Sequence, residues 1–282
     1  MSSRASSSRA SSPVGDPDDA VSRHRRIRGR VAAALRSRVT RPVRGVAPLA
    51  PLAAAHRLRR RLAPGRYTDA PAFALRRVDP ARIRRSVLET APRTPQWGRV
   101  VGGDFDAEWE PFDERPVPTG LRQRYVEGRD WADTALVEAF DDQLARFGNA
   151  WGYTSREGFT RRCREIDRLH ASLRDQGYRR QETLRGPDAY ATTARLDEIN
   201  VDVGRDGTLY WRAYGQHRLA LAKLLGIESV PVLIHRRHAN WQAVRDRLRD
   251  TASGSRSDRR LHPDLRDLGA ETSDADTPGE NS

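Results

Sequence analysis

The stretch DEINVDVGRDGTLYWRAYGQHRLALAKLLG, residues 197–226, decides the fold. Residues 199–203 alternate between apolar and polar side chains, which predicts a β-strand with one buried face. Asp206-Gly207 is a dipeptide typical of hairpin turns, and residues 208–213 follow it as the partner strand. The apolar residues that come next recur at helical spacing and end at a glycine. This stretch therefore predicts a β-hairpin that leads directly into an α-helix.

The turn between the hairpin and the helix reads Gly215-Gln216-His217-Arg218. A helix that only fills a core more often begins with Ser, Thr or Asp as its cap. Here glycine allows a ligand to approach the backbone, and the first amide groups of the helix carry the positive end of its dipole. Arg218 can hold phosphate oxygens with two N–H groups, and His217 can donate a hydrogen bond or move a proton near neutral pH. The turn therefore predicts an anion site, with the alternative that His217 and Arg218 cap the helix and pair with acidic side chains.

Further helices and strands are predicted on both sides of the hairpin. Apolar spacing indicates four helices: residues 131–147, a helix from a Thr154–Glu157 capping box to Gly177, residues 216–225 closed by Gly226, and residues 241–250 capped by Asn240. Residues 229–237 predict another strand, while residues 72–87 suggest a short strand, a proline turn and a helix. Residues 95–113 are expected to form a loop. The expected fold is α+β, a small mixed sheet with packed helices.

The charge of the chain is divided unevenly. The net charge is +13, and residues 1–66 contribute 16 Arg and 3 Asp, so the remaining 216 residues carry 35 basic and 35 acidic side chains. We expect residues 1–66 to form a basic tail, largely disordered or helical, and residues 251–282 to form a disordered polar tail. The domain between them covers residues 67–250, with a helical insertion at about 107–160. Residues 20–66 offer a contact for nucleic acid or for an anionic surface, and a solvated tail is the alternative.

The 282 residues include one cysteine, Cys163, which lies on the apolar face of a predicted helix. A disulfide framework and a multi-cysteine metal site within one chain are therefore excluded, and a buried small side chain is expected. No apolar run reaches the roughly 18 residues that a membrane-spanning helix needs. These features predict a cytoplasmic protein without a transmembrane segment. His235 and His238 end a predicted strand without an adjacent third ligand, so we expect no metal site.

The order of these motifs resembles the ParB/sulfiredoxin superfamily, the fold of the amino-terminal domain of chromosome-partition ParB proteins. The resemblance is carried by the hairpin, the Gly-Gln-His-Arg turn, LALAKLLG at 219–226 and VPVLIHRRH at 230–238, and it is strongest over residues 165–238. In that superfamily the corresponding turn binds the phosphates of a nucleotide. The resemblance therefore implies nucleotide or phosphate binding at residues 215–218, with ATP, ADP or CTP and Mg²⁺ as the suggested ligands.

Three departures limit what the resemblance implies. Gln216 stands where sulfiredoxin has its catalytic cysteine, which excludes sulfinic-acid reduction by that route. Partition ParB proteins carry Gly-Glu-Arg-Arg at this turn, so a CTP-driven switch is not expected here. Those proteins also continue into a helix-turn-helix and a dimerisation segment, for which the 32 polar residues after residue 250 leave no room. The archaeal free serine kinase of the same superfamily transfers phosphate to a small hydroxyl compound, which keeps phosphotransferase activity open.

Phosphoryl transfer or nucleotide hydrolysis would also need carboxylates near the phosphates. Asp104 and Asp106 in the sequence GGDFD are the candidates, because alternation along an extended segment aims both side chains the same way. Together with His217 they form the predicted catalytic set. The alternatives are that the aspartates bind local backbone amides, or that Asp197-Glu198 supplies the acid pair. The hypothesis is a nucleotide- or phosphate-binding domain with possible phosphotransferase or hydrolase activity, and its alternative is a non-catalytic binding module attached through the basic tail.

Overall fold

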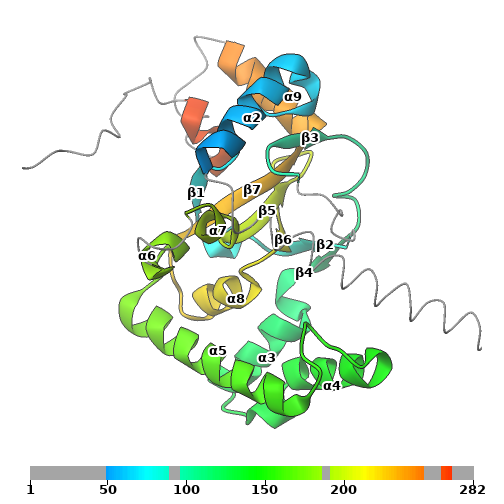
Figure 1. Cartoon of the computed structure of the whole chain (residues 1–282), viewed down its shortest axis with the longest axis vertical. Coiled ribbons are helices and arrows are strands. Elements are labelled where there is room, and N and C mark those ends of the chain that lie inside the picture. Colours follow the sequence, from blue (N-terminus) through cyan, green and yellow to red (C-terminus); the bar gives the residue numbers. More distant parts are fainter. Residues whose placement is uncertain (1–48, 89–95, 186–190, 251–261, 269–282) are drawn as a thin grey trace, which may run out of the picture. The chain divides into compact units, whose positions relative to one another are not determined.

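The computed structural model describes residues 49–88, 96–185, 191–250 and 262–268 of the chain. The two expected tails lie outside these ranges, except for residues 49–66 and 262–268. Within the described ranges, helices and one mixed β-sheet form the folded body, in agreement with an α+β class (Figure 1).

Seven strands of the described residues form the mixed sheet. In spatial order they are β1 (Leu75–Val78), β7 (Val230–His238), β5 (Ile199–Val203), β6 (Leu209–Ala213), β2 (Arg85–Val87) and β4 (Trp109–Pro111), and β3 (Arg99–Val101) also pairs with β7. β5 and β6 are antiparallel, with Val201 opposite Trp211 and Val203 opposite Leu209. β7 runs parallel to β5 in the middle of the sheet. The hairpin predicted from the sequence is therefore confirmed.

The central strand β5 is buried along its whole length, whereas its alternating sequence predicted only one buried face. Its apolar residues join the main core. Its polar residues are also buried: Asn200 accepts a hydrogen bond from the indole N–H of Trp97, and Asp202 pairs with Arg236. Buried polar groups are tolerated when they have partners inside the protein. The alternating pattern thus arises from paired polar groups and not from a solvent-facing side.

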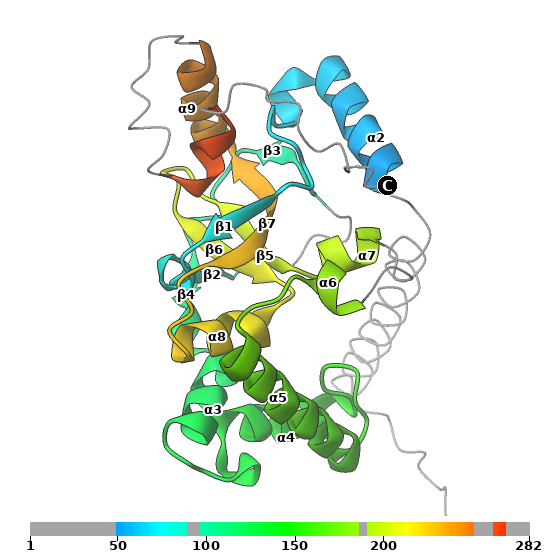
Figure 2. The same cartoon turned by 90° about the vertical axis from the view of Figure 1, so that its left-hand side faces the viewer.

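Helices lie at both ends of the sheet. The described α-helices are α2 (Leu49–Leu62), α3 (Pro116–Tyr125), α4 (Ala135–Phe147), α5 (Arg156–Gln176), α6 (Gln181–Arg185), α7 (Ala191–Leu196), α8 (Gln216–Leu224) and α9 (Ala239–Asp250). α8 lies between the sheet and the helices α3 and α5 (Figures 1 and 2). Leu219 and Leu221 of α8 are therefore buried on different sides of the helix. The insertion expected at about 107–160 contains α3, α4 and the start of α5, where Phe140 stacks on Phe159.

The ends of three helices show which expected caps are used. The side chain of Ser155, and not that of Thr154, caps α5. α9 begins before Asn240, because Nδ1 of His238 accepts the amide hydrogen of Asn240. α8 ends as predicted, with Gly226 in the left-handed conformation at a φ of 65°. These three predicted helices are present, and neighbouring residues decide where each one begins or ends.

The helix expected near residue 85 is a strand. Asp79 caps a single 3₁₀ turn, η2 (Pro80–Arg82), and the chain then continues as β2. β2 pairs with β6 on one side and with β4 on the other. The expected loop at residues 95–113 contains the short strands β3 and β4. Pairing with strands distant in the sequence therefore overrides the local preference of this region.

Two segments that were expected to be tails pack onto the body. α2 buries His56 and packs Leu52 and other apolar residues against the cluster around Phe73. Residues Pro263–Leu268 form the 3₁₀ helix η5, in which Asp264 is fully buried. The folded body therefore includes residues on both sides of the expected domain limits, 67 and 250.

Candidate functional site

The Gly215 turn has a backbone that requires glycine. Tyr214 and Gly215 both adopt left-handed φ angles, 54° and 64°. A Cβ atom on Gly215 would lie 2.7 Å from Cγ1 of Ile199, so a larger residue would clash there. The amide of Leu219 makes the first hydrogen bond of α8, to the carbonyl of Gly215 at 2.8 Å. The amides of residues 216–218 precede that bond and can donate to a ligand.

Arg218 in this turn pairs with an acidic side chain of the protein. Its guanidinium lies 3.2 Å from Oε2 of Glu198 and 3.2 Å from the hydroxyl of Tyr178, and it donates to the carbonyl of Asp197. Glu198 is fully buried and also accepts hydrogen bonds from Tyr178 and from the amide of Gln181. Arg218 therefore pairs with an acidic side chain, which was the alternative to anion binding in the sequence analysis. This pairing fixes the start of α8 to the segment before β5.

His217 is neutral at pH 7. Burial lowers the pKa of His217 to about 4, and the charges of Arg162 and Arg218 lower it further in the same direction. A neutral imidazole can donate one hydrogen bond to an anion but adds no charge.

Asp104 and Asp106 both pair with Arg205. Nη2 of Arg205 lies 2.8 Å from Oδ1 of Asp104 and 2.8 Å from Oδ1 of Asp106. Oδ2 of Asp106 accepts the backbone amide of Arg205 at 2.7 Å. Burial raises the pKa of Asp106, but the hydrogen bonds from Arg205 outweigh it and keep this pKa below its usual value. Both aspartates thus stabilise the loop after β5.

The two predicted groups of site residues lie at opposite ends of β5. The Gly215 turn contacts Ile199, the first residue of the strand, and Asp106 contacts Gly204, which follows its last residue. Five residues at about 3.3 Å each separate the two points by about 16 Å. The structure therefore does not bring Asp104 and Asp106 to His217.

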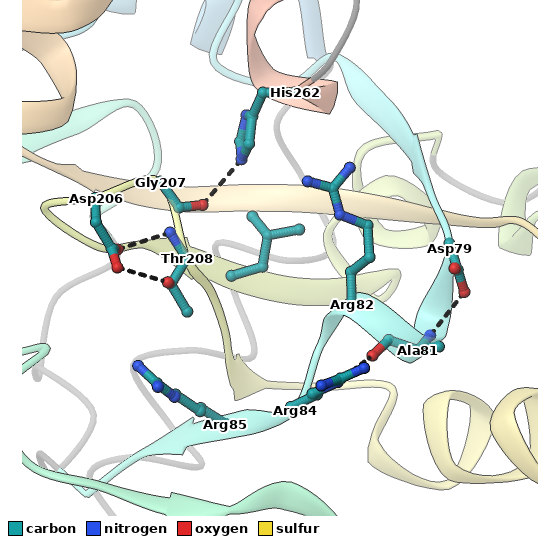
Figure 3. A pocket seen from close by; sticks show the side chains of 10 residues that line it. Asp79, Ala81, Arg82, Arg84, Arg85, Asp206, Gly207, Thr208 and His262 are labelled. Atoms are coloured by element: carbon teal, nitrogen blue, oxygen red, sulfur yellow. Dashed lines mark hydrogen bonds between the residues drawn. The ribbon is translucent and has the colours of Figure 1, made fainter.

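A cavity of about 460 Å³ opens beside the turn between β5 and β6 (Figure 3). It is lined by Asp79, Ala81, Arg82, Arg84, Arg85, Asp206, Gly207, Thr208, Leu209 and His262. Three of these residues are arginines from the short segment formed by η2 and β2. The prediction from sequence did not include them, although the run RIRR at 82–85 is the pattern that could have indicated an anion site.

The wall opposite the arginines is held by hydrogen bonds within the protein. Asp206 accepts from the amide and from the hydroxyl of Thr208, both at 2.9 Å. Nε2 of His262 donates to the carbonyl of Gly207 at 2.9 Å, and its Nδ1 accepts the amide hydrogen of Asp264. Burial lowers the pKa of His262, which favours the neutral ring. His262 thus supports the cavity wall.

A second cavity, of about 560 Å³, adjoins the first. The two cavities share Ala81, Arg84 and Arg85 as lining residues. The second one is also lined by Trp109, whose ring lies 4.2 Å from the guanidinium carbon of Arg85. Lys223, the lysine of α8, lies at its far side, where it pairs with Asp113 at 2.7 Å.

The remaining residues singled out from the sequence have structural roles. Cys163 is buried, and burial raises the pKa of its thiol to about 11. His235 accepts the amide hydrogen of Gln96, and His238 contacts the carbonyl of Gly103. Within the described ranges no three His, Cys, Asp or Glu side chains are grouped as metal ligands.

The helices in the described ranges lack the length and apolar character that a membrane crossing requires. Comparison of the chain with family models, with curated proteins and with solved structures gives no match.

Proposed function

We propose that this protein is a ParB/sulfiredoxin-like domain that binds the phosphate group of a nucleotide at residues 215–218. The observation that carries the proposal is the left-handed Gly215 at the start of α8, which leaves the next three amides available to an anion. The superfamily that the sequence resembles binds nucleotide phosphates at the corresponding turn. ATP, ADP and CTP, each with or without Mg²⁺, are the candidate ligands.

The side chains of the turn differ in their proposed roles. Gln216 and the neutral His217 supply hydrogen bonds next to the amides. Arg218 is a positioning residue, because its guanidinium is held by Glu198 and by the carbonyl of Asp197.

The proposal concerns binding and not phosphoryl transfer. Asp104 and Asp106, the predicted catalytic carboxylates, are about 16 Å from this turn along β5. Glu198 lies beside the turn but is fully buried and already accepts three partners. Neither arrangement supports a carboxylate that positions a metal ion or takes a proton from a substrate.

Isothermal titration of the full chain with ATP, ADP and CTP tests the proposal. The informative variant is Gln216→Glu, since a carboxylate at this position suits the helix dipole and preserves stability but repels a phosphate. We expect it to weaken nucleotide binding by at least about tenfold, equivalent to about 1.4 kcal/mol. Asn240→Asp in the first turn of α9 is the matched control and should bind normally. Absence of heat with all three nucleotides, or unchanged binding by Gln216→Glu, would refute nucleotide binding at this turn.

A second candidate is a binding module that contacts nucleic acid or an anionic surface through its basic N-terminal part. The observation that favours it is the exposed arginines of α2 and the residues after it, namely Arg57, Arg59, Arg61 and Arg66. Because α2 packs onto the body, deletion of residues 1–48 preserves the fold better than deletion of residues 1–66. This candidate predicts salt-dependent binding to DNA or RNA that weakens in the deletion variant and weakens further when these arginines are replaced. Binding that is unchanged in both would contradict it.

A further inference from the structure

We propose that the cavity beside the β5–β6 turn binds a small phosphorylated molecule, with Arg84 and Arg85 as the ligands of its phosphate group (Figure 3). Its volume of about 460 Å³ lies within the range of small-molecule sites. The site is independent of the one at Gly215, because β6 runs between them and its five residues span about 16 Å.

The two arginines keep their charge available for a ligand. Within residues 49–88, 96–185, 191–250 and 262–268, no carboxylate lies within ion-pair distance of Arg84 or Arg85. Nε of Arg84 donates to the carbonyl of Ala81 at 3.2 Å, which leaves both of its terminal NH₂ groups for an anion. These are the groups that hold phosphate oxygens in pairs.

Arg85 is held in place by neutral partners. Its Nη1 donates to the hydroxyl of Tyr210 at 3.3 Å, and its guanidinium carbon lies 4.2 Å from the ring of Trp109. Stacking on an aromatic ring fixes the guanidinium without neutralising it. An anion that enters the cavity therefore meets a guanidinium whose orientation is already set, so less side-chain entropy is lost on binding.

The two aspartates of the cavity wall are engaged by the backbone. Asp79 accepts the amide of Ala81 at 2.8 Å, and Asp206 accepts both the amide and the hydroxyl of Thr208. Each therefore stabilises a turn. Burial raises the pKa of Asp206, but the hydrogen bonds from Thr208 and the charge of Arg85 together lower it below its usual value. Neither aspartate forms an ion pair with Arg84 or Arg85. The two carboxylates are thus engaged in turns, whereas Arg84 and Arg85 beside them keep N–H groups for an anion.

The adjoining cavity indicates where the rest of the ligand lies. It shares Arg84 and Arg85 with the first cavity and adds Trp109, Pro111 and Glu114, together with the ion pair of Lys223 and Asp113. Trp109 is 39% exposed. An exposed indole offers an apolar surface next to the phosphate ligands. The geometry fits a phosphate monoester whose organic part is aromatic or otherwise apolar, and we expect such an ester to bind more tightly than inorganic phosphate.

A polyanionic nucleic acid fits this site less well. Residues 67–282 carry equal numbers of basic and acidic side chains, so this part of the chain presents no excess positive charge to a phosphate backbone, and the arginines of α2 do not line this cavity. The arginines line a cavity together with Asp79 and Asp206, which suits a single small anion.

The test is isothermal titration calorimetry of the full chain with inorganic phosphate and with phenyl phosphate. Arg84→Gln should weaken the binding of both about tenfold, the usual effect of losing one charged hydrogen bond, and Arg84→Gln with Arg85→Gln should abolish it. Arg59→Gln, an equal change of charge at an exposed position of α2, is the matched control and should bind normally. Thermal unfolding of each variant verifies that it is folded.

Gln216→Glu separates this site from the one at Gly215. The inference holds if Gln216→Glu binds phenyl phosphate normally while Arg84→Gln does not, whether or not nucleotides bind at the turn. It is overturned if the native chain binds neither probe at millimolar concentration, or if Arg59→Gln weakens binding as much as Arg84→Gln. Loss of phenyl phosphate binding in Gln216→Glu would also overturn it, because the two anion sites would then be one.

Discussion

Two groups of arginines at the same end of the sheet are used in different ways. At the end of β7, which runs parallel to β5, Arg237 is almost completely buried, as is Arg245 of α9, and both contact the buried carboxylate of Asp264. Beside the neighbouring β5–β6 turn, Arg84 is exposed and Arg85 is half-buried, and they contact a carbonyl, a hydroxyl and an aromatic ring. The same residue type thus neutralises a buried acid in one group and presents its charge to a cavity in the other.

The difference teaches how to distinguish a structural arginine from a ligand-binding one. A buried charge is stable only when it is paired, so a fully buried guanidinium implies a carboxylate partner and offers little to a ligand. An arginine that is oriented by neutral groups keeps its full charge and several N–H donors. Arg218 belongs with the first kind, because Glu198 already holds it.

The largest expected effect comes from removing Asp264. Asp264→Ala leaves Arg237 and Arg245 buried without their shared carboxylate, which should cost about 3–5 kcal/mol of unfolding free energy. Chemical denaturation measures the loss. Asp206→Ala, which removes a carboxylate from the cavity wall and one turn interaction, should cost only about 1 kcal/mol. Equal losses for the two variants would show that the two groups of charges do not differ as described.

Acidification should lower the unfolding free energy through His217 before it does so through Asp264. Burial lowers the pKa of His217 to about 4 from an unfolded value of 6.5, so between these pH values the unfolded chain binds a proton that the folded chain does not. Stability should therefore fall by about 2 kcal/mol from about pH 7 to about pH 4.5. The pKa of Asp264 is lowered by Arg237 and Arg245 in spite of its burial, so its contribution is lost only at lower pH. In His217→Gln the unfolding free energy should change less between about pH 7 and about pH 4.5. If it falls with pH as steeply as in the native chain, the loss of stability does not come from His217.

Salt should weaken phosphate binding in the cavity much more than it weakens the buried ion pair of Arg237 and Asp264. Raising the salt concentration to about 1 M shortens the screening length to about 3 Å. Dissolved ions then screen the exposed charges strongly and the buried charges little. Phosphate binding at Arg84 should weaken about tenfold, whereas the coupling between Arg237 and Asp264 in a double-mutant cycle should change by less than about 0.5 kcal/mol. Calorimetry and denaturation at two salt concentrations provide both values. Equal sensitivity would mean that solvent reaches both sites.

The smallest effect is expected for stability after Arg84→Ala. Its side chain is exposed and donates a hydrogen bond to the carbonyl of Ala81, so unfolding free energy should change by less than about 0.5 kcal/mol. A loss of more than about 2 kcal/mol would show that Arg84 has a structural role like that of Arg237.

The sequence predicted the centre of the fold and several of its boundaries. The β5–β6 hairpin, the turn at Gly215 and the end of α8 at Gly226 are all where the pattern indicated. The helices near residues 140 and 165 were also correct, because apolar spacing and capping residues are local signals. Strand β2 was predicted as a helix, because nothing local indicates that β6 and β4 lie on its two sides.

By itself the sequence determined the elements whose information lies within about one turn of helix or one hairpin, and it marked Gly215 as a place where a ligand could approach the backbone. The structure showed that glycine is required there because a Cβ atom would clash with Ile199. Only the tertiary structure decided which charges meet. It joined Arg218 to Glu198 and Asp106 to Arg205, it placed Asp264 beneath α9, and it left Arg84 beside a cavity. The reason is that an ion pair depends on chain segments distant in sequence, so no local pattern specifies whether an arginine finds a carboxylate.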